Sequence, residues 1–224
     1  MKIEIFYHIC AKGGAAVLEI IEEQLLTIKN SELYDKIDKV NCCLVGDDEH
    51  NYQYLLDKIP SYGDKFKIAK SQFKDMTYEF FTVDYMSKII SEDGLYLYLH
   101  SKGVTKTASH PVRDWRRCME YFLITKADKC IEKLKEGYDT VGIMKTFFKY
   151  PHYSGNFWWA TGKYLIKIFS ETPIPKQYGG IELYIVKNNS KSYDMYPIHD
   201  IYPKYDGYHV LLPLEKYENY SSLY

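Results

Sequence analysis

The spacing of hydrophobic positions changes several times along the 224-residue chain, and it predicts alternating strands and helices. Short apolar runs predict strands at Lys2–Cys10, Val40–Val45, Phe66–Ala69, Leu95–Leu99 and Thr140–Ile143. Apolar residues three and four positions apart predict helices from Ala15, at Tyr52–Ile59, Met76–Ile90, from Trp115 to Leu134, Lys163–Phe169 and Ile181–Val186. This alternation predicts an α/β fold with a mainly parallel central sheet and helices on both faces.

The sequence shows neither a long linker nor an internal repeat, so we expect a single domain over residues 1–224. Asp114 is expected to cap the helix that begins near Trp115, and Gly137 to end it. Tyr150–Ala160 is an aromatic loop that leads into a strand. The irregular, aromatic last third is expected to be a substrate-facing extension.

Charge and cysteine content narrow the classes of protein. The 29 basic and 30 acidic residues leave a net charge of −1, which excludes nucleic-acid binding by overall charge, although a local basic patch stays open. Five cysteines without a Cys-x-x-Cys pair fit reduced, buried thiols in a cytoplasmic protein. The apolar run in the first ten residues is too short for a signal peptide. No apolar stretch of the sequence is long enough to span a membrane.

Aromatic residues make up 17% of the chain, and 24 of them are Tyr. Tyr and Trp combine a flat apolar face with a polar tip, which suits sugars and bases. Codon bias in an A/T-rich genome would produce the same surplus, so this observation leaves both interpretations open.

Polar residues follow three of the predicted strands. His8 lies at the end of the first strand, Gly46 and Asp47 follow the second, and His100-Ser101-Lys102-Gly103 follows Leu95–Leu99. In open parallel sheets, ligands bind outside the carboxyl ends of the strands. Lys supplies charge, Ser a hydrogen bond and Gly close backbone approach, so the last turn suits a diphosphate. Polar turns after strands are also common without any ligand.

Four segments, in this order, resemble small glycosyltransferases with the GT-A fold, of the viral and bacterial polysaccharide type. The segments are YLHSKG (Tyr98–Gly103), DWR (Asp114–Arg116), HYSGNFWWA (His152–Ala160) and GGIE (Gly179–Glu182). The resemblance implies a GT-A-like fold with a Rossmann-like nucleotide-binding half. Residues 1–110 would hold a nucleotide-sugar donor, and residues 111–224 a glycan or other hydroxyl acceptor.

The resemblance also implies roles for individual residues. The donor-binding residues that it implies are Tyr7, His8, Gly46, Asp47, Ser101, Asp114, Asn156, Trp158 and Trp159. Lys102 and His100 would stabilise the leaving diphosphate, and Glu182 would accept the acceptor's proton. Glu182 also suits the first turn of a helix, where a carboxylate is favoured by the helix dipole.

His100-Ser101-Lys102 occupies the place where many relatives carry Asp-x-Asp, which binds Mn²⁺ or Mg²⁺. The use of such a metal is therefore open here, with His100 as the candidate ligand and with His199 and His209 as further metal or phosphate candidates.

Two other functions compete with transfer. A non-catalytic carbohydrate-binding module would use Trp158, Trp159 and the surplus of Tyr as sugar-stacking surfaces. A nucleotidyltransferase would share the sheet but normally carries a metal-binding carboxylate pair and a Gly-rich nucleotide loop, neither of which is evident.

Overall fold

The computed structural model describes residues 1–75, 77–105, 109–147, 150–187 and 190–223. Its strands are β1 (Ile3–Ala11), β2 (Lys39–Gly46), β3 (Phe66–Phe73), β4 (Leu95–His100), β5 (Thr140–Gly142), β6 (Lys145–Thr146), β7 (His152–Tyr153), β8 (Trp158–Thr161) and β9 (Ser192–Asp194). Its α-helices are α1 (Ala15–Lys29), α2 (Leu33–Lys36), α3 (Glu49–Lys58), α4 (Phe80–Ser87), α5 (His110–Glu120), α6 (Ala127–Lys135), α7 (Gly162–Glu171), α8 (Ile198–Ile201) and α9 (Leu214–Leu223). A 3₁₀ helix spans Ile59–Tyr62, and a π-helical turn spans Tyr121–Thr125.

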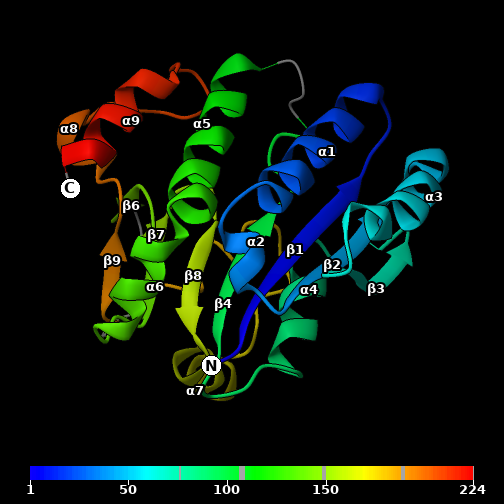
Figure 1. Ribbon diagram of the computed structural model, residues 1–224, viewed down its shortest axis with the longest axis horizontal. Coiled ribbons are helices and arrows are strands. Elements are labelled where there is room, and N and C mark those ends of the chain that lie inside the picture. The colour runs from blue at the N-terminus through cyan, green and yellow to red at the C-terminus, as the bar shows by residue number, and fades with distance from the viewer. Residues whose placement is uncertain (76, 106–108, 148–149, 188–189, 224) are drawn as a thin grey trace.

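A seven-stranded sheet in the order β3-β2-β1-β4-β8-β5-β9 forms the centre of the molecule (Figure 1). β3, β2, β1 and β4 are parallel, β8 is antiparallel to β4 and β5, and β9 is parallel to β5. The predicted α/β class with a mainly parallel sheet is confirmed.

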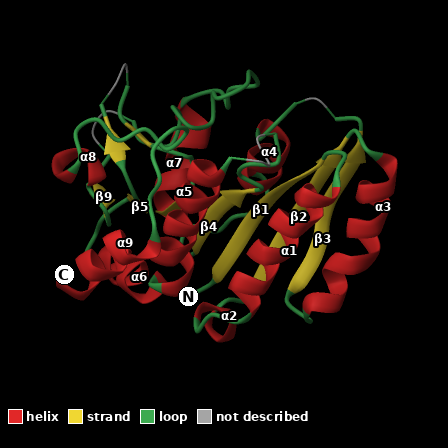
Figure 2. Ribbon diagram, turned by 90° about the horizontal axis from the view of Figure 1, so that it is seen from above, coloured by secondary structure: helices red, strands yellow, loops and turns green. Residues whose placement is uncertain are grey.

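Successive side chains of a strand point to opposite faces of the sheet, and both faces are buried here. In β4, Leu97 packs into the cluster that includes α1, α5 and α6, whereas Tyr96 and Tyr98 pack with Met86 of α4 and Leu165 of α7. Figure 2 shows α1 and α4 on opposite sides of the sheet. The predicted helices on both faces are therefore confirmed.

The antiparallel orientation of β8 determines what reaches the functional edge. Trp158, at the start of β8, pairs with Tyr98 near the carboxyl end of β4. The turn that precedes β8 therefore lies at the same edge as the carboxyl ends of β1, β2 and β4, where Ala11 pairs with Gly46 and His8 with His100.

Several predicted boundaries were wrong. α5 begins at His110, with Pro111 in its first turn, so Asp114 lies inside the helix and does not cap it. The π-helical turn divides the long predicted helix into α5 and α6. Ile181–Val186 is a series of turns, and its shape is held by tertiary contacts such as the hydrogen bond from the Tyr184 hydroxyl to the Ile168 carbonyl, 3.0 Å long.

Other boundaries shifted less. β3 continues to Phe73, four residues beyond its predicted end, and α4 begins only at Phe80. Met76, on which the predicted start of that helix rests, lies outside the described residues.

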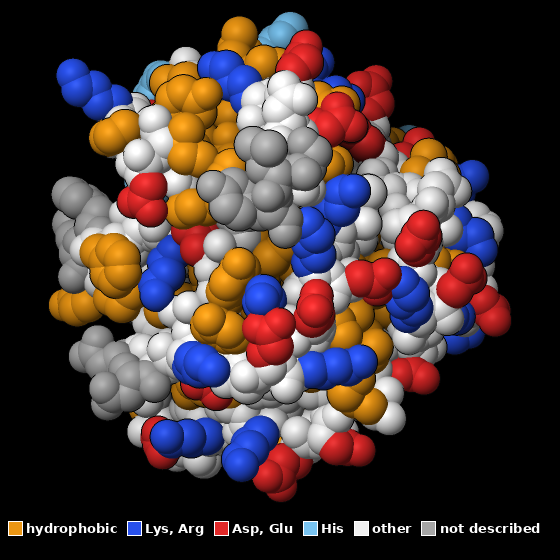
Figure 3. Space-filling view, turned by 60° about the vertical axis from the view of Figure 1, so that its left-hand side comes forward, with side chains coloured by type: hydrophobic (Ala, Val, Ile, Leu, Met, Phe, Trp, Pro, Cys, Tyr) orange, Lys and Arg blue, Asp and Glu red, His pale blue; other side chains and the backbone are white. Residues whose placement is uncertain are grey.

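Among the described residues, no helix combines the length and the apolarity that crossing a bilayer requires. All five cysteines are free, and only Cys10 is not fully buried, so the prediction of unpaired buried thiols is confirmed for the others. On the face shown in Figure 3, acidic and basic side chains are interspersed, in keeping with the near-zero net charge.

Candidate functional site

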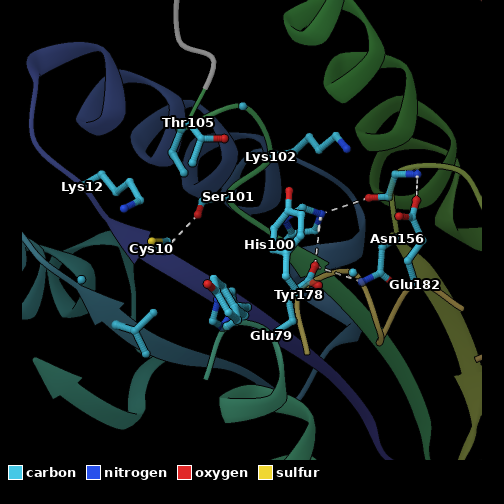
Figure 4. Close-up of a pocket in the computed structure, with 18 of the residues that line it drawn as sticks. Cys10, Lys12, Glu79, His100, Ser101, Lys102, Thr105, Asn156, Tyr178 and Glu182 are labelled. Atoms are coloured by element: carbon cyan, nitrogen blue, oxygen red, sulfur yellow. Dashed lines mark hydrogen bonds and ion pairs between the residues drawn. The ribbon is translucent and has the colours of Figure 1, made fainter. Parts of the chain in front are cut away.

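A pocket of about 280 Å³ lies at the carboxyl ends of β1, β2 and β4 (Figure 4). The segments that follow these strands form one side of it, and the turn before β8 and the segment around Glu182 form the other. Eight of the residues predicted from the sequence line this pocket: His8, Gly46, Asp47, His100, Ser101, Lys102, Asn156 and Glu182.

The loop after β1 is held in shape by the start of α3. The Asp48 carboxylate caps α3 by accepting a hydrogen bond from the Asn51 backbone N–H, 2.8 Å away. The Asn51 side-chain amide in turn donates to the Lys12 carbonyl at 2.6 Å. With its backbone held, Lys12 lies at one end of the pocket, where its ammonium pairs with Asp47 at 2.7 Å.

Ser101 and Lys102 extend the edge of β4 into the pocket. Ser101 is buried, and its hydroxyl oxygen accepts a hydrogen bond from the Cys10 backbone N–H at 3.0 Å. The hydroxyl proton is therefore available to an acceptor such as a phosphate oxygen. The Lys102 ammonium lies 3.9 Å from the centre of the Trp115 ring, a cation–π contact at the other end of the pocket from Lys12.

Two histidines lie side by side on β1 and β4 and face the pocket. His8 Nδ1 is 2.8 Å from the Thr82 hydroxyl, and His100 Nε2 donates to the Gly155 carbonyl at 3.0 Å. Burial lowers the pKa of each from 6.5 to about 4, so both imidazoles are uncharged at neutral pH. Because His100 Nε2 carries the proton, its Nδ1 holds the lone pair.

The backbone of Gly155 joins His100 to Glu182. Its carbonyl accepts from His100, and its N–H donates to Glu182 Oε1 at 2.7 Å. Gly155 has φ 93°, and a Cβ there would lie 2.6 Å from the sulfur of Met119, so only glycine fits. This turn places a carboxylate and an uncharged imidazole on the same wall of the pocket.

Asn156, also left-handed at φ 58°, links a further carboxylate to this wall. Its amide nitrogen donates to Glu79 Oε1 at 3.0 Å, and its amide oxygen accepts from the indole N–H of Trp158 at 3.0 Å. The indole thus determines which end of the amide faces Glu79.

An aromatic rim was not predicted from the sequence. The rings of Tyr78 and Tyr178 meet edge to face at 5.4 Å, and the two residues are 42% and 77% exposed. Tyr208 adds a third ring, edge-on to Trp115 at 5.2 Å. All three tyrosines line the pocket. The predicted third strand ended at Ala69, whereas β3 ends at Phe73. With the correct end, the rule that ligands bind at strand ends would have indicated Tyr78 and Glu79.

The chain matches the model of one protein family. A family model described as a domain of unknown function (DUF8361) matches residues 6–195. The chain belongs to this family. The matched residues include every pocket segment named above except the one that carries Tyr208.

No curated protein matches the chain. Among solved structures, 4-diphosphocytidyl-2C-methyl-D-erythritol synthase from Anaerococcus prevotii DSM 20548 is similar to it, with 11% identity and a TM-score of 0.49. The match covers 99% of this chain and 96% of that one.

Four predicted binding residues do not line the pocket, and two of them are the tryptophans. Trp158 and Trp159 point to opposite faces of β8, and both are buried. Trp158 stacks on Tyr98 at 5.0 Å, and the indole N–H of Trp159 donates to the Leu123 carbonyl at 2.8 Å. The expectation that one of them stacks on a sugar was wrong, because the layers on both sides of the sheet cover both rings.

Tyr7 and Asp114 are the other two corrections. Tyr7 alternates with His8 and faces away from the pocket, where its hydroxyl donates to Gln24 of α1 at 2.8 Å. Asp114 lies within α5, with one carboxylate oxygen 3.6 Å from Arg113 Nε. Tyr7 therefore packs in the core beside α1, and Asp114 is a half-buried residue of α5.

The candidate metal ligands do not converge. His199 and His209 lie outside the pocket, and exposed His209 contacts Asp206 at 2.8 Å. Within the part of the chain that the structure describes, no three His, Cys, Asp or Glu side chains are arranged to hold a metal ion. No chemical step below depends on a metal.

Proposed function

We propose that this chain is a glycosyltransferase that moves a hexose-like sugar from a nucleotide-sugar donor to a hydroxyl group of a glycan or other acceptor. One observation carries the proposal: Lys12, Lys102, the Ser101 hydroxyl and Glu182 line the same pocket at the strand ends. A transferase needs both parts, one for the leaving diphosphate and one for the acceptor's proton.

The donor diphosphate would lie between Lys12 and Lys102, with the Ser101 hydroxyl donating to a phosphate oxygen. In the transfer step the acceptor oxygen forms a bond to the anomeric carbon, and the bond from that carbon to the phosphate oxygen breaks. The electron pair of this bond goes to the diphosphate, whose growing negative charge the lysines stabilise. Glu182 takes the proton from the acceptor hydroxyl.

The geometry of Glu182 supports this role. Oε1 is held at 2.7 Å by the Gly155 N–H, so the carboxylate is oriented before the acceptor binds. The exposed rings of Tyr78 and Tyr178 stand close by in the same pocket, and they offer the acceptor sugar an aromatic surface.

The alternative, a non-catalytic carbohydrate-binding module, rested on Trp158, Trp159 and the Tyr surplus. Both tryptophans are buried, so exposed tyrosines such as Tyr78 and Tyr178 are what still supports it. Such a module would bind glycans and give no donor turnover.

The test measures nucleotide release from a panel of UDP-, GDP- and CMP-sugars, with and without EDTA. We expect release from at least one donor, and a fall of about 100-fold in Lys102→Ala, as expected when one charged stabilising group is lost. Lys163→Ala, which removes an exposed lysine of α7 outside the pocket, is the matched control and should behave as the unaltered protein does. Normal turnover in Lys102→Ala contradicts the role of Lys102, and no release from any donor contradicts the proposed function.

A further inference from the structure

Glu79 lines the pocket, and the transfer step proposed above assigns no role to its carboxylate. It immediately precedes α4, and its side chain is only 15% exposed. Oε1 is 3.0 Å from the amide nitrogen of Asn156 and 3.7 Å from His100 Nε2. Among the described residues no donor contacts Oε2, so this oxygen is available to a ligand in the pocket.

The charges around Glu79 leave this part of the pocket negative. His8 and His100, the imidazoles nearest to it, are uncharged, and Asn156 is neutral. Among the described residues that line the pocket, the positive side chains are Lys12 and Lys102, which lie at its two upper ends in Figure 4, with Glu79 below them. An anionic group suits the upper ends, and a neutral group with hydroxyl donors suits the lower part.

The position of Glu79 is determined by residues behind it. The indole N–H of Trp158 donates to the Asn156 amide oxygen, so the amide nitrogen must face Glu79. Trp158 is itself buried and stacked on Tyr98. The carboxylate is therefore oriented in advance, a condition for discriminating between similar ligands.

From this arrangement we propose that Glu79 selects a neutral donor sugar: it accepts hydrogen bonds from the sugar's hydroxyl groups and disfavours sugars that carry a carboxylate. The inference rests on the proposed function and adds the class of donor sugar. A second carboxylate next to Glu79 would be repelled in a partly buried site where water screens charge poorly. A hydroxyl group at the same place would instead form a charge-assisted hydrogen bond.

Pairs of donors that differ only in this charge test the proposal. kcat/KM is measured for UDP-glucose against UDP-glucuronate and for GDP-mannose against GDP-mannuronate, with CMP-sialate as a further anionic donor. We expect the neutral member of the accepted pair to be preferred by about 100-fold or more, as expected where a polar site meets the wrong group. An anionic donor used as well as the best neutral donor overturns the proposal.

Glu79→Gln shows whether this side chain is responsible. The amide still accepts from Asn156 through its oxygen, so the fold should hold, and the melting temperature checks this. We expect the ratio of neutral to anionic kcat/KM to fall about tenfold or more. Glu49→Gln is the matched control, because it makes the same change at an exposed carboxylate of α3 outside the pocket, and the ratio should stay as it was.

The failures are distinguishable. A ratio unchanged in Glu79→Gln overturns the role of Glu79 while the proposed function stands. Absence of turnover with every donor removes both.

Discussion

Glu182 reaches the pocket from a series of turns, and one backbone N–H orients it. The sequence placed this carboxylate after Gly179-Gly180 at an expected helix start, and the helix is not there. Its position comes from the buried neighbours Ile181 and Ile185, which anchor the segment against α7. A pattern of apolar residues indicated burial correctly, but burial alone did not distinguish turns from a helix.

Replacing Glu182 with Gln tests its role as a base. Gln keeps an oxygen for the Gly155 N–H but cannot take a proton, so we expect kcat for transfer to fall about 100-fold or more. The nucleotide should still raise the melting temperature as much as in the unaltered protein. Transfer at the original rate would exclude Glu182 as the base.

The lowered pKa values of His8 and His100 predict a pH dependence of stability. Their folded-state pKa of about 4 lies below the ordinary 6.5, so the unfolded chain binds protons more readily between these values. The free energy of unfolding should therefore fall as pH drops from 6.5 towards 4, by up to about 1.4 kcal/mol per pH unit for each histidine.

Urea unfolding at pH 7 and pH 5 measures this loss in the free energy of unfolding. The variant His8→Asn shows how much of the loss comes from His8 and how much from other groups. Burial raises the pKa of Glu120 to about 7 and that of Asp194 to about 6, which acts in the opposite direction over the same range. Since both proteins keep these carboxylates, the smaller loss expected in His8→Asn isolates the histidine. Equal losses in both proteins would show that His8 titrates normally.

At the scale of elements, the turn before β8 is the feature on which the site depends. Gly155 and Asn156 adopt left-handed conformations next to Met119 and Trp115. The sequence HYSGNFWW pointed to this segment through its aromatics, whereas the structure gives the pocket Gly155 and Asn156 and buries the rings. Burial by the helix layers on both faces of β8 is a tertiary effect that no local pattern contains.

Gly155→Ala tests the turn. A Cβ would meet Met119 and require a left-handed alanine, so we expect a loss of about 3 kcal/mol in the free energy of unfolding and a fall in transfer. Gly179→Ala is the control: it is also left-handed, at φ 71°, but its Cβ meets nothing within 4 Å, so about 1 kcal/mol is expected. Equal losses in the two variants would contradict the packing argument.

The aromatic rim predicts a separate effect on the acceptor. Tyr178→Ala should raise KM for the acceptor about tenfold and leave donor hydrolysis unchanged, whereas Tyr178→Phe keeps the ring and should stay near the original value. Tyr150→Ala removes another exposed ring, outside the pocket, and should change neither constant. A rise in KM for the donor instead would show that these tyrosines contact the donor and not the acceptor.

At the scale of the molecule, much of the architecture followed from periodicity. The strands β1, β2 and β4 and the rule of strand ends indicated the lining residues from His8 to Lys102, and the family resemblance added Asn156 and Glu182. Strand order, the reversal of β8 and the addition of β9 at the sheet edge depend on contacts between distant residues, and the sequence contains no local signal for them. For the same reason, Glu79 and the tyrosine rim were found only in the structure.

The central claim is that the pocket at this sheet edge binds a nucleotide-sugar. The most direct measurement is the melting temperature of the full chain with UDP, GDP and CMP, each alone and as its sugar conjugate, because a ligand that binds only the folded protein stabilises it. We predict that one nucleotide raises the melting temperature and that its sugar conjugate raises it further. Stabilisation by free glycans and by no nucleotide would contradict the account.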